Sequence, residues 1–201
     1  DRGYRQGGNP KHQWDGLVPI TAMPTMNDPP EGWIRSANNR TAPDDYPYPL
    51  SGTWATGHRA RRVREMLEEK EKLSAKDFAR MQMDTKSMRA VEGVPHLLDI
   101  LSLVSDERMQ QAASLLKTWD YYMKPDSTGA AIFETFFSRW LHRVAAERFD
   151  NQNAVEIAGA IGGLSLELLS KDQHGWFKNG NREEAIVATA CEVIDDLSSR
   201  L

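Results

Sequence analysis

Prolines and glycines are concentrated before residue 58, and this uneven distribution limits most strongly what the chain can fold into. Of the 10 prolines, only Pro95 and Pro125 lie beyond that point, and the same segment contains Gly3, Gly7, Gly8, Gly16, Gly32, Gly52 and Gly57. Because proline lacks a backbone donor and fixes φ, residues 1–57 cannot form long helices. We predict an irregular, proline-rich arm with two short strands, near residues 16–19 and 32–37. Such an arm buries little by itself, so we expect it to rest on neighbouring chain.

From residue 58 onward, apolar residues recur with the period of amphipathic helices. We expect helices near 58–72, 75–84, 86–103, from Ser105, 128–149, 154–170 and after Asn181. Gly93-Val94-Pro95 is expected to break the third of these into two pieces. Segment 128–149 is the most apolar and should be the central helix. The sequence therefore predicts a mainly α fold, with the arm at 1–57 and a helical bundle domain at 58–201.

Local signals refine this helical prediction. Ser74 and Asp77 have the spacing of a capping box, and the helix that they begin should bury Phe78 and Met81. Asn181 is expected to cap the last helix. Gly159, Gly162 and Gly163 each weaken a helix by about 1 kcal/mol relative to alanine, so we expect close helix–helix contact there as compensation.

Composition excludes several classes of protein. With 201 residues and 40% hydrophobic residues, the chain can form a real core. A net charge of -4 and a pI near 5.8 argue against a nucleic-acid partner, which needs a basic face. No apolar run approaches the length that crosses a membrane, so no membrane span is expected. The single cysteine, Cys191, forbids an internal disulfide, and its apolar neighbours indicate a buried, inert thiol.

No self-contained active site is apparent in this sequence. The histidines are scattered, at positions 12, 58, 96, 142 and 174, so clustered metal ligands are not expected. The glycines at 159–163 lack the spacing of a dinucleotide loop, and no Gly-x-Ser-x-Gly motif marks a nucleophile. By composition and spacing alone, the chain is a helical domain, and a non-catalytic helical protein-interaction module is one hypothesis for its function.

The segment around Asn38-Asn39 suggests a second hypothesis. Trp33, Ile34 and Ala37 indicate a short, largely buried extended segment that ends at the two asparagines. Asparagine is unfavourable inside regular structure because its side chain competes for backbone hydrogen bonds. The pair is therefore either a plain turn or a site that requires amide donors at a fixed point.

The flanking residues resemble the β-subunit of penicillin acylases, which are N-terminal-nucleophile (Ntn) hydrolases. The matching pieces occur in the family's order: Trp14-Asp15-Gly16-Leu17-Val18-Pro19, Met23-Pro24, Asn27-Asp28-Pro29, Gly32-Trp33-Ile34, Ala37-Asn38-Asn39, Tyr46-Pro47, Trp54, Arg59-Ala60-Arg61-Arg62-Val63, Gln82-x-Asp84 and Leu115-Leu116-x-x-Trp119-Asp120. The likeness covers about residues 10–140 in detail and extends beyond them only in helical character. It implies that the arm belongs to the αββα core of an Ntn hydrolase.

In this family, a serine at the N-terminus of the β-subunit attacks an acyl amide. Asp1 is not that serine, and Trp14 onward resembles a region far inside the β-subunit, so the resemblance implies a fragment that is inactive alone. Asn38 matches the oxyanion asparagine, with Asn39 as the alternative if the register shifts by one residue. Arg62 matches the arginine that orients the catalytic centre, with Arg61 as the alternative.

The resemblance also carries expectations about the parent enzyme. Its partners would be the remainder of the β-subunit, the α-subunit and an acyl-amide substrate, and its location would be periplasmic or secreted. Family members carry a calcium-ligating carboxylate shortly after Tyr-Pro, but residues 48–52 contain none. We therefore expect no cofactor on this chain, although the parent could bind calcium elsewhere. Because residues outside this chain would build most of the acyl pocket, the sequence does not identify the acyl group.

Overall fold

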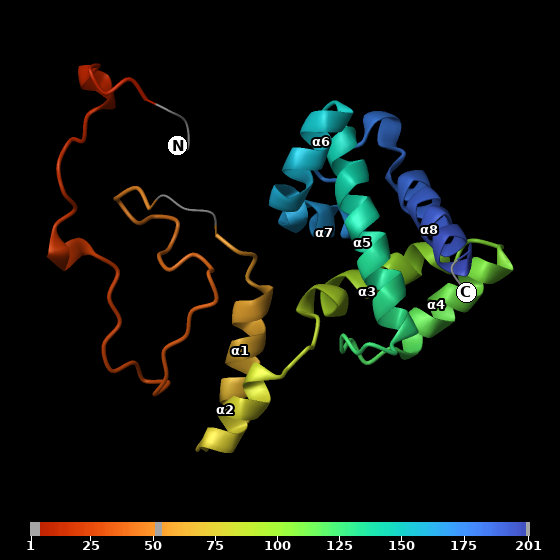
Figure 1. Cartoon of the computed structure of the whole chain (residues 1–201), viewed down its shortest axis with the longest axis horizontal. Coiled ribbons are helices and arrows are strands. Elements are labelled where there is room, and N and C mark those ends of the chain that lie inside the picture. Colours follow the sequence, from red (N-terminus) through yellow and green to blue (C-terminus); the bar gives the residue numbers. More distant parts are fainter. Residues whose placement is uncertain (1–4, 51–53, 200–201) are drawn as a thin grey trace. The chain divides into compact units, whose positions relative to one another are not determined.

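The chain forms two compact units, residues 1–70 and 71–201. The computed structural model describes residues 5–50 and 54–199, and the regular structure within these ranges is helical (Figure 1). The first unit contains the arm and α1, and the second contains α2 to α8. The predicted domain boundary lies at residue 58, before α1, whereas the two compact units meet after residue 70, so α1 belongs to the first unit. That residues 58–201 fold as one domain stays a prediction.

The helices occur at the following positions. The α-helices are α1 (His58–Glu68), α2 (Ala75–Gln82), α3 (Met88–Leu101), α4 (Glu107–Thr118), α5 (Thr128–Ala146), α6 (Asn151–Ala158), α7 (Gly162–Ser170) and α8 (Arg182–Ser199). Short 3-10 helices are η1 (Pro10–His12), η2 (Ile20–Ala22), η3 (Gly159–Ile161) and η4 (Lys178–Gly180). The mainly α fold is thus confirmed.

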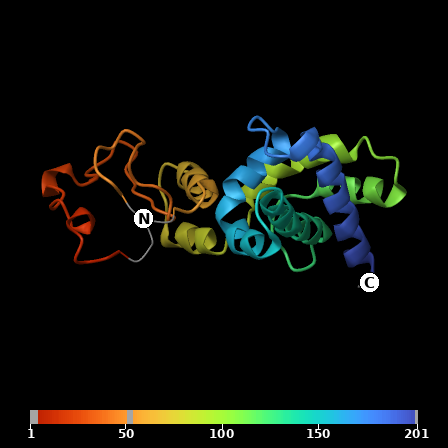
Figure 2. The same ribbon diagram turned by 90° about the horizontal axis from the view of Figure 1, so that it is seen from above.

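The arm is an irregular chain, as Figures 1 and 2 show, interrupted only by η1 and η2. Neither predicted strand, at 16–19 or 32–37, forms among the described residues. Of the segment expected to be largely buried, Ala37 is buried and Trp33 half-buried, but the Ile34 side chain is 63% exposed. The burial prediction is therefore wrong for Ile34. The physical reason is that a strand buries its side chains only against a neighbouring strand or layer, and the described part of the arm provides no paired strand.

Apolar side chains remain in contact with solvent along this arm. Trp14, Leu17 and Ile20 are 86–87% exposed. Three large apolar side chains this exposed within seven residues of sequence are typical of a segment that contacts other protein. This supports the expectation that the arm rests on neighbouring chain.

Of the three predicted helix caps, the structure shows the one at Ser74. The Asp77 backbone N–H donates to Ser74 Oγ over 3.4 Å, and the Ser74 N–H donates to the Asp77 carboxylate over 2.9 Å, which completes the capping box. Asp106, rather than the predicted Ser105, caps α4 by accepting from Arg108 and Met109. Helix α8 begins directly after Asn181, but the buried Asn181 Oδ1 has no hydrogen-bond partner among the described residues.

Helix α3 runs unbroken from Met88 to Leu101 with Pro95 inside it, so the predicted break at 93–95 is wrong. Pro95 lies on the exposed side of the helix, whereas Ala90, Val94 and Leu97 on the other side are fully buried. Proline costs a helix about 3 kcal/mol. Burying each large apolar side chain contributes about 1.5–3 kcal/mol, so packing outweighs the missing hydrogen bond.

Helix α5 is the central helix of the second unit, as predicted. It packs against α4, α6, α7 and α8 (Figure 1). Its aromatic side chains are fully buried and stack on one another. The ring centroids are 5.8 Å apart for Phe133 and Phe137 and 6.2 Å apart for Phe136 and Trp140. Phe177, from the loop before α8, extends the stack with its ring centroid 5.4 Å from that of Trp140. Trp140 Nε1 donates to the Ser165 carbonyl over 2.7 Å, so the large indole is buried with its polar atom satisfied.

The predicted helix 154–170 is interrupted. Helix α6 ends at Ala158, η3 follows, and α7 begins at Gly162. The expected close helix–helix contact is not present at Gly159, where an added Cβ would meet nothing within 4 Å, but at Gly162 it would lie 4.0 Å from Leu141 Cδ2 of α5. By contrast, Gly129 in α5 would place a Cβ 2.7 Å from both Cβ and Cγ of Trp119. Close packing therefore requires a glycine at Gly129, and at Gly93 in α3 an added Cβ would lie 2.9 Å from Leu166 Cδ1.

Two further side chains differ from their predicted burial. Phe78 is 49% exposed, so the prediction that α2 buries it is wrong. Cys191 is half-buried and packs against the core of the second unit, rather than being fully buried.

The loop before α8 is held by one carboxylate. Asp172 accepts hydrogen bonds from the backbone N–H groups of Trp176 (2.7 Å) and Phe177 (2.9 Å). Burial raises the pKa of Asp172, but the backbone hydrogen bonds from Phe177, Trp176 and His174 outweigh it, so the net pKa lies below its usual value. Asp172 thus places Phe177 against Trp140.

Gly159→Ala should raise the free energy of unfolding by about 0.5–1 kcal/mol, because the backbone there is already helical (φ −64°, ψ −28°) and alanine restricts the unfolded chain. Gly129→Ala should lower it by about 1–3 kcal/mol, because Trp119 has to move. Urea unfolding followed by circular dichroism measures both. If Gly159→Ala were as destabilising as Gly129→Ala, the packing described here would be incorrect.

Asp172→Asn should make the stability of the folded state depend less on pH at acidic pH. Because the pKa of Asp172 is lower in the folded state, its contribution is fully present above about pH 4, the unfolded value, and is lost as the pH falls through the folded pKa. Thermal unfolding between about pH 2 and pH 6 measures this dependence. Glu156→Gln, which changes an exposed carboxylate on α6, is the control and should leave the slope unchanged.

Candidate functional site

The two asparagines lie in a tight turn that is tied to the chain just before α1. Asn38 has a left-handed backbone conformation, with φ at +60°. Asparagine adopts this conformation more readily than most residues other than glycine. The Ala55 backbone N–H donates to the Asn38 carbonyl over 2.7 Å. The turn is therefore fixed to a segment distant in sequence.

Arg59, in the first turn of α1, provides the second connection. Its Nη2 donates to Asn38 Oδ1 over 2.8 Å and to the Ala37 carbonyl over 3.0 Å. One guanidinium nitrogen thus holds both the backbone of the turn and the amide side chain of Asn38.

This contact fixes the direction of the Asn38 amide. Arginine can only donate hydrogen bonds, so the atom that faces Arg59 has to be the amide oxygen. The Asn38 NH₂ group therefore points away from Arg59. None of the described residues accepts a hydrogen bond from Asn38 Nδ2, and the side chain is exposed.

Asn39 uses both ends of its amide within the turn itself. Its Oδ1 accepts from the Ala37 backbone N–H over 3.2 Å, and its Nδ2 donates to the Arg40 carbonyl over 2.9 Å. This is the arrangement of a residue that stabilises a turn. Of the two candidates, Asn38 keeps both amide hydrogens free of described acceptors, whereas Asn39 uses one of its two in the turn.

Arg62 lies one helical turn after Arg59, on the same side of α1. Its Nη1 is 3.4 Å from Glu65 Oε2, and its side chain is only 12% exposed. The role predicted for Arg62, or for the exposed Arg61, stays a prediction. The sequence pattern marked the arginine cluster, but it offered no signal that selects Arg59 as the residue that contacts Asn38.

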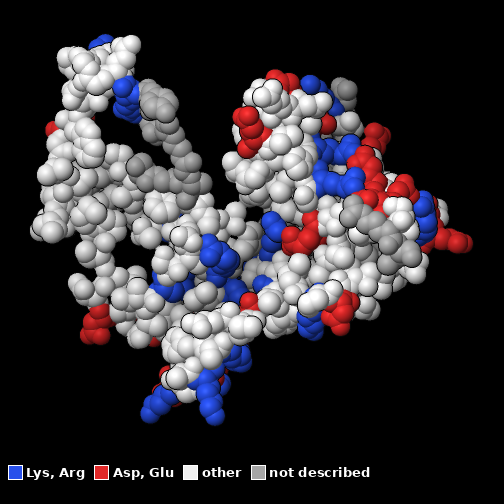
Figure 3. Space-filling model, in the orientation of Figure 1, with Lys and Arg blue, Asp and Glu red and all other residues white. Residues whose placement is uncertain are grey.

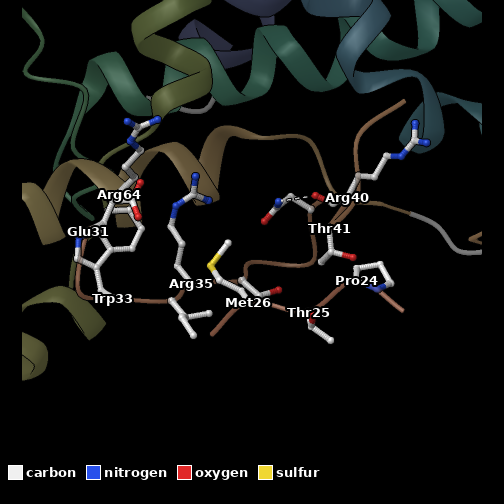
Figure 4. A pocket seen from close by; sticks show the side chains of 12 residues that line it. Pro24, Thr25, Met26, Glu31, Trp33, Arg35, Arg40, Thr41 and Arg64 are labelled. Carbon is white, nitrogen blue, oxygen red and sulfur yellow. Dashed lines mark hydrogen bonds between the residues drawn. The ribbon is translucent and has the colours of Figure 1, made fainter. Parts of the chain in front are cut away.

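A pocket of about 570 Å³ adjoins the turn, because Asn39 and Arg40 form part of its wall (Figure 4). The rest of its wall comes from residues 24–26, 31, 33–36 and 41, with Arg64 from α1. Figure 4 shows Arg35 between Trp33 and Met26, and its Nε is buried with no hydrogen-bond partner among the described residues. The wall thus combines apolar side chains with guanidinium groups, a lining that suits a ligand with both apolar and polar parts.

Several charged side chains on the second unit form ion pairs between helices. The acidic residues of α8 contact arginines of α4 and α5: Asp195 with Arg108 and Asp196 with Arg139 over 2.7 Å each, and Glu192 with Arg143. Figure 3 accordingly shows Lys and Arg side chains next to Asp and Glu over this unit. This surface is a solvated face held by ion pairs.

The described residues meet the requirements of neither a metal site nor a membrane-spanning helix. Within 5–50 and 54–199, His, Cys, Asp and Glu side chains form no group that could hold a metal ion. Within residues 48–52, the segment that follows Tyr-Pro and contains no calcium-ligating carboxylate, Ser51 and Gly52 lie outside the described residues. Among the helices of the described part, none has the length and apolarity needed to cross a membrane.

Comparison with known proteins identifies the family. A sequence model of the family described as penicillin amidase matches residues 3–201. The chain therefore belongs to the penicillin amidase family, as its motifs predicted.

Individual relatives are acylases. The chain is 28% identical to penicillin acylase 2 proenzyme from Pseudomonas sp. (strain SE83), over 96% of this chain and 26% of that protein. It is 26% identical to the acyl-homoserine lactone acylase QuiP of Pseudomonas fluorescens (strain Pf0-1), over 84% of this chain and 22% of that protein. The chain thus spans about a quarter of the length of these relatives.

Proposed function

We propose that this chain is part of the β-subunit of an acylase that hydrolyses acyl amides through an acyl-serine intermediate, with the nucleophile outside the chain. The acylase relatives and the match to the family support the class of reaction. The short share of each relative that the chain spans supports its being one piece of a larger enzyme. A helical interaction module has no comparable support, because the relatives are enzymes.

In the proposed reaction, the serine hydroxyl oxygen forms a bond to the amide carbon, and its proton passes to the serine's own α-amine. An α-amine titrates near ~7.7–8 and is therefore a suitable base close to neutral pH. The carbonyl oxygen becomes an oxyanion. The C–N bond then breaks, the amine leaves with the proton, and water hydrolyses the acyl-serine ester to release the acid.

Within this scheme, Asn38 is the oxyanion donor. The observation that carries this assignment is the contrast between the two asparagines: the Asn38 Nδ2 points away from the turn with no described acceptor, whereas both ends of the Asn39 amide bind backbone. A preorganised amide donor stabilises charge that develops on the carbonyl oxygen. Arg62 is proposed to orient the catalytic centre through its planar guanidinium.

The remaining parts of the proposal concern the parent enzyme. The rest of the β-subunit and the α-subunit would cover the arm, whose exposed Trp14, Leu17 and Ile20 are suited to such contacts. The substrate would be an acyl amide, no cofactor is assigned to this chain, and the enzyme would work in the periplasm or outside the cell.

The purified 201-residue chain should hydrolyse no acyl amide, because oxyanion stabilisation without a nucleophile leaves the bond-forming step uncatalysed. A chromogenic phenylacetyl or long-chain acyl anilide is a suitable substrate. Turnover by this chain alone that a serine-directed inhibitor abolishes would refute the proposal.

In the complete acylase, Asn38→Ala should lower kcat by ~10²–10³, the effect of removing one oxyanion donor. KM should change far less, because the donor acts mainly when the carbonyl oxygen becomes charged. Steady-state kinetics, normalised by active-site titration with a covalent inhibitor, measures both constants.

Asn39→Ala is the matched control, since it removes the neighbouring amide. It should weaken the turn and lower the thermal unfolding temperature while kcat stays within a few-fold of wild type. Full kcat in Asn38→Ala would contradict the oxyanion assignment. A folded Asn39→Ala enzyme without activity would move the donor by one residue.

A further inference from the structure

We infer that Arg59 is the positioning residue for the oxyanion donor: it holds the Asn38 amide in the one orientation that presents its NH₂ group. This inference rests on the proposed function of Asn38. It assigns a role to an arginine other than Arg62 or Arg61, the residues that the sequence motif indicates.

The need for a positioning residue follows from the chemistry of the side chain. The oxygen and the NH₂ group of an asparagine amide have nearly the same shape, and rotation by about 180° exchanges them. In the wrong orientation, Asn38 would present its oxygen to the developing oxyanion and repel it. Catalysis by this amide therefore requires a neighbour that distinguishes the two ends.

Arg59 is such a neighbour because a guanidinium has only donors. Its Nη2 lies 2.8 Å from Asn38 Oδ1, a good length for a charge-assisted hydrogen bond. The flipped amide would place its own N–H groups against Arg59 and lose this bond. Accepting a hydrogen bond from a cation also polarises the amide, which strengthens the bond that its NH₂ group donates.

The same nitrogen also fixes the backbone of the turn. Arg59 Nη2 donates to the Ala37 carbonyl over 3.0 Å, and the Ala55 N–H donates to the Asn38 carbonyl over 2.7 Å. Arg59 is supported in turn by α1, whose Ala60 and Met66 are buried. The Asn38 amide is therefore held by a side chain from a helix rather than from the irregular arm. A helix positions a side chain more precisely than an irregular segment does.

Other groups near the turn do not duplicate this contact. The Asn39 amide binds the backbone of Ala37 and Arg40, and Arg40 forms an ion pair with Asp44. Among the described residues, Arg59 is the donor to Asn38 Oδ1. Loss of Arg59 should thus release the amide without an immediate replacement.

The test uses Arg59→Ala, Asn38→Ala and the double variant in the complete acylase. Arg59→Ala should lower kcat by ~10-fold or more, because the released amide presents its NH₂ group to the oxyanion only part of the time. KM should stay within about 3-fold. In the Asn38→Ala background, adding Arg59→Ala should change kcat by less than about 2-fold, because residues that act as one unit are not additive.

Two further variants keep the test decisive. Arg59→Lys retains a cationic donor and should recover part of the lost kcat, and it serves where Arg59→Ala does not fold or mature. Arg80→Ala removes an exposed arginine on α2 and should leave kcat unchanged. Active-site titration and thermal unfolding confirm that equal amounts of folded, mature enzyme are compared.

Each outcome has a separate meaning. If Asn38→Ala retains full kcat, the proposed function of Asn38 fails, and this inference fails with it. If Asn38→Ala is impaired while Arg59→Ala and Arg59→Lys are fully active, only the role of Arg59 is overturned. If the two losses multiply in the double variant, Arg59 acts independently of Asn38, which also overturns it. A double variant equal to Asn38→Ala supports the inference.

Discussion

Burial of the aromatic face of α5 is the constraint on which the second unit depends. Phe133, Phe136, Phe137 and Trp140 are fully buried, and Phe177 from the loop before α8 continues the stack. Each large aromatic buries about 150–250 Å², which at about 25 cal/mol per Å² contributes several kcal/mol. Helices α3, α4, α7 and α8 share one buried core with these aromatics, whereas α6 packs against Ala145 in a separate small cluster.

The first unit is organised by a different principle. It buries little apolar surface, and hydrogen bonds between residues 37–38 and residues 55–59 fix its turn instead. Trp14, Leu17 and Ile20 remain exposed. The first unit therefore contains both the candidate site and the exposed apolar side chains that are suited to contact with further protein. The second unit, which has the large core, contributes no residue to the candidate site.

The contrast between Asn38 and Asn39 supports the proposed function, because Arg59 gives two identical side chains different hydrogen-bond partners. Asn39 satisfies its amide with backbone, so its contribution is to the turn. Asn38 receives a hydrogen bond from Arg59 and keeps its NH₂ group available. Preorganised donors of this kind need no rearrangement as charge develops, which is why they are effective in catalysis.

The sequence by itself determined the helical class, most helix starts, the central position of α5, the family and the asparagine pair. These features follow from apolar periodicity and from caps such as Ser74 with Asp77, which involve residues a few positions apart. Only the tertiary structure decided that α3 continues through Pro95, that Gly129 rather than Gly159 needs to be glycine, and that Asn38 rather than Asn39 presents its amide. These outcomes depend on partners far along the chain, such as Arg59, 21 residues from Asn38, whose proximity no local pattern encodes.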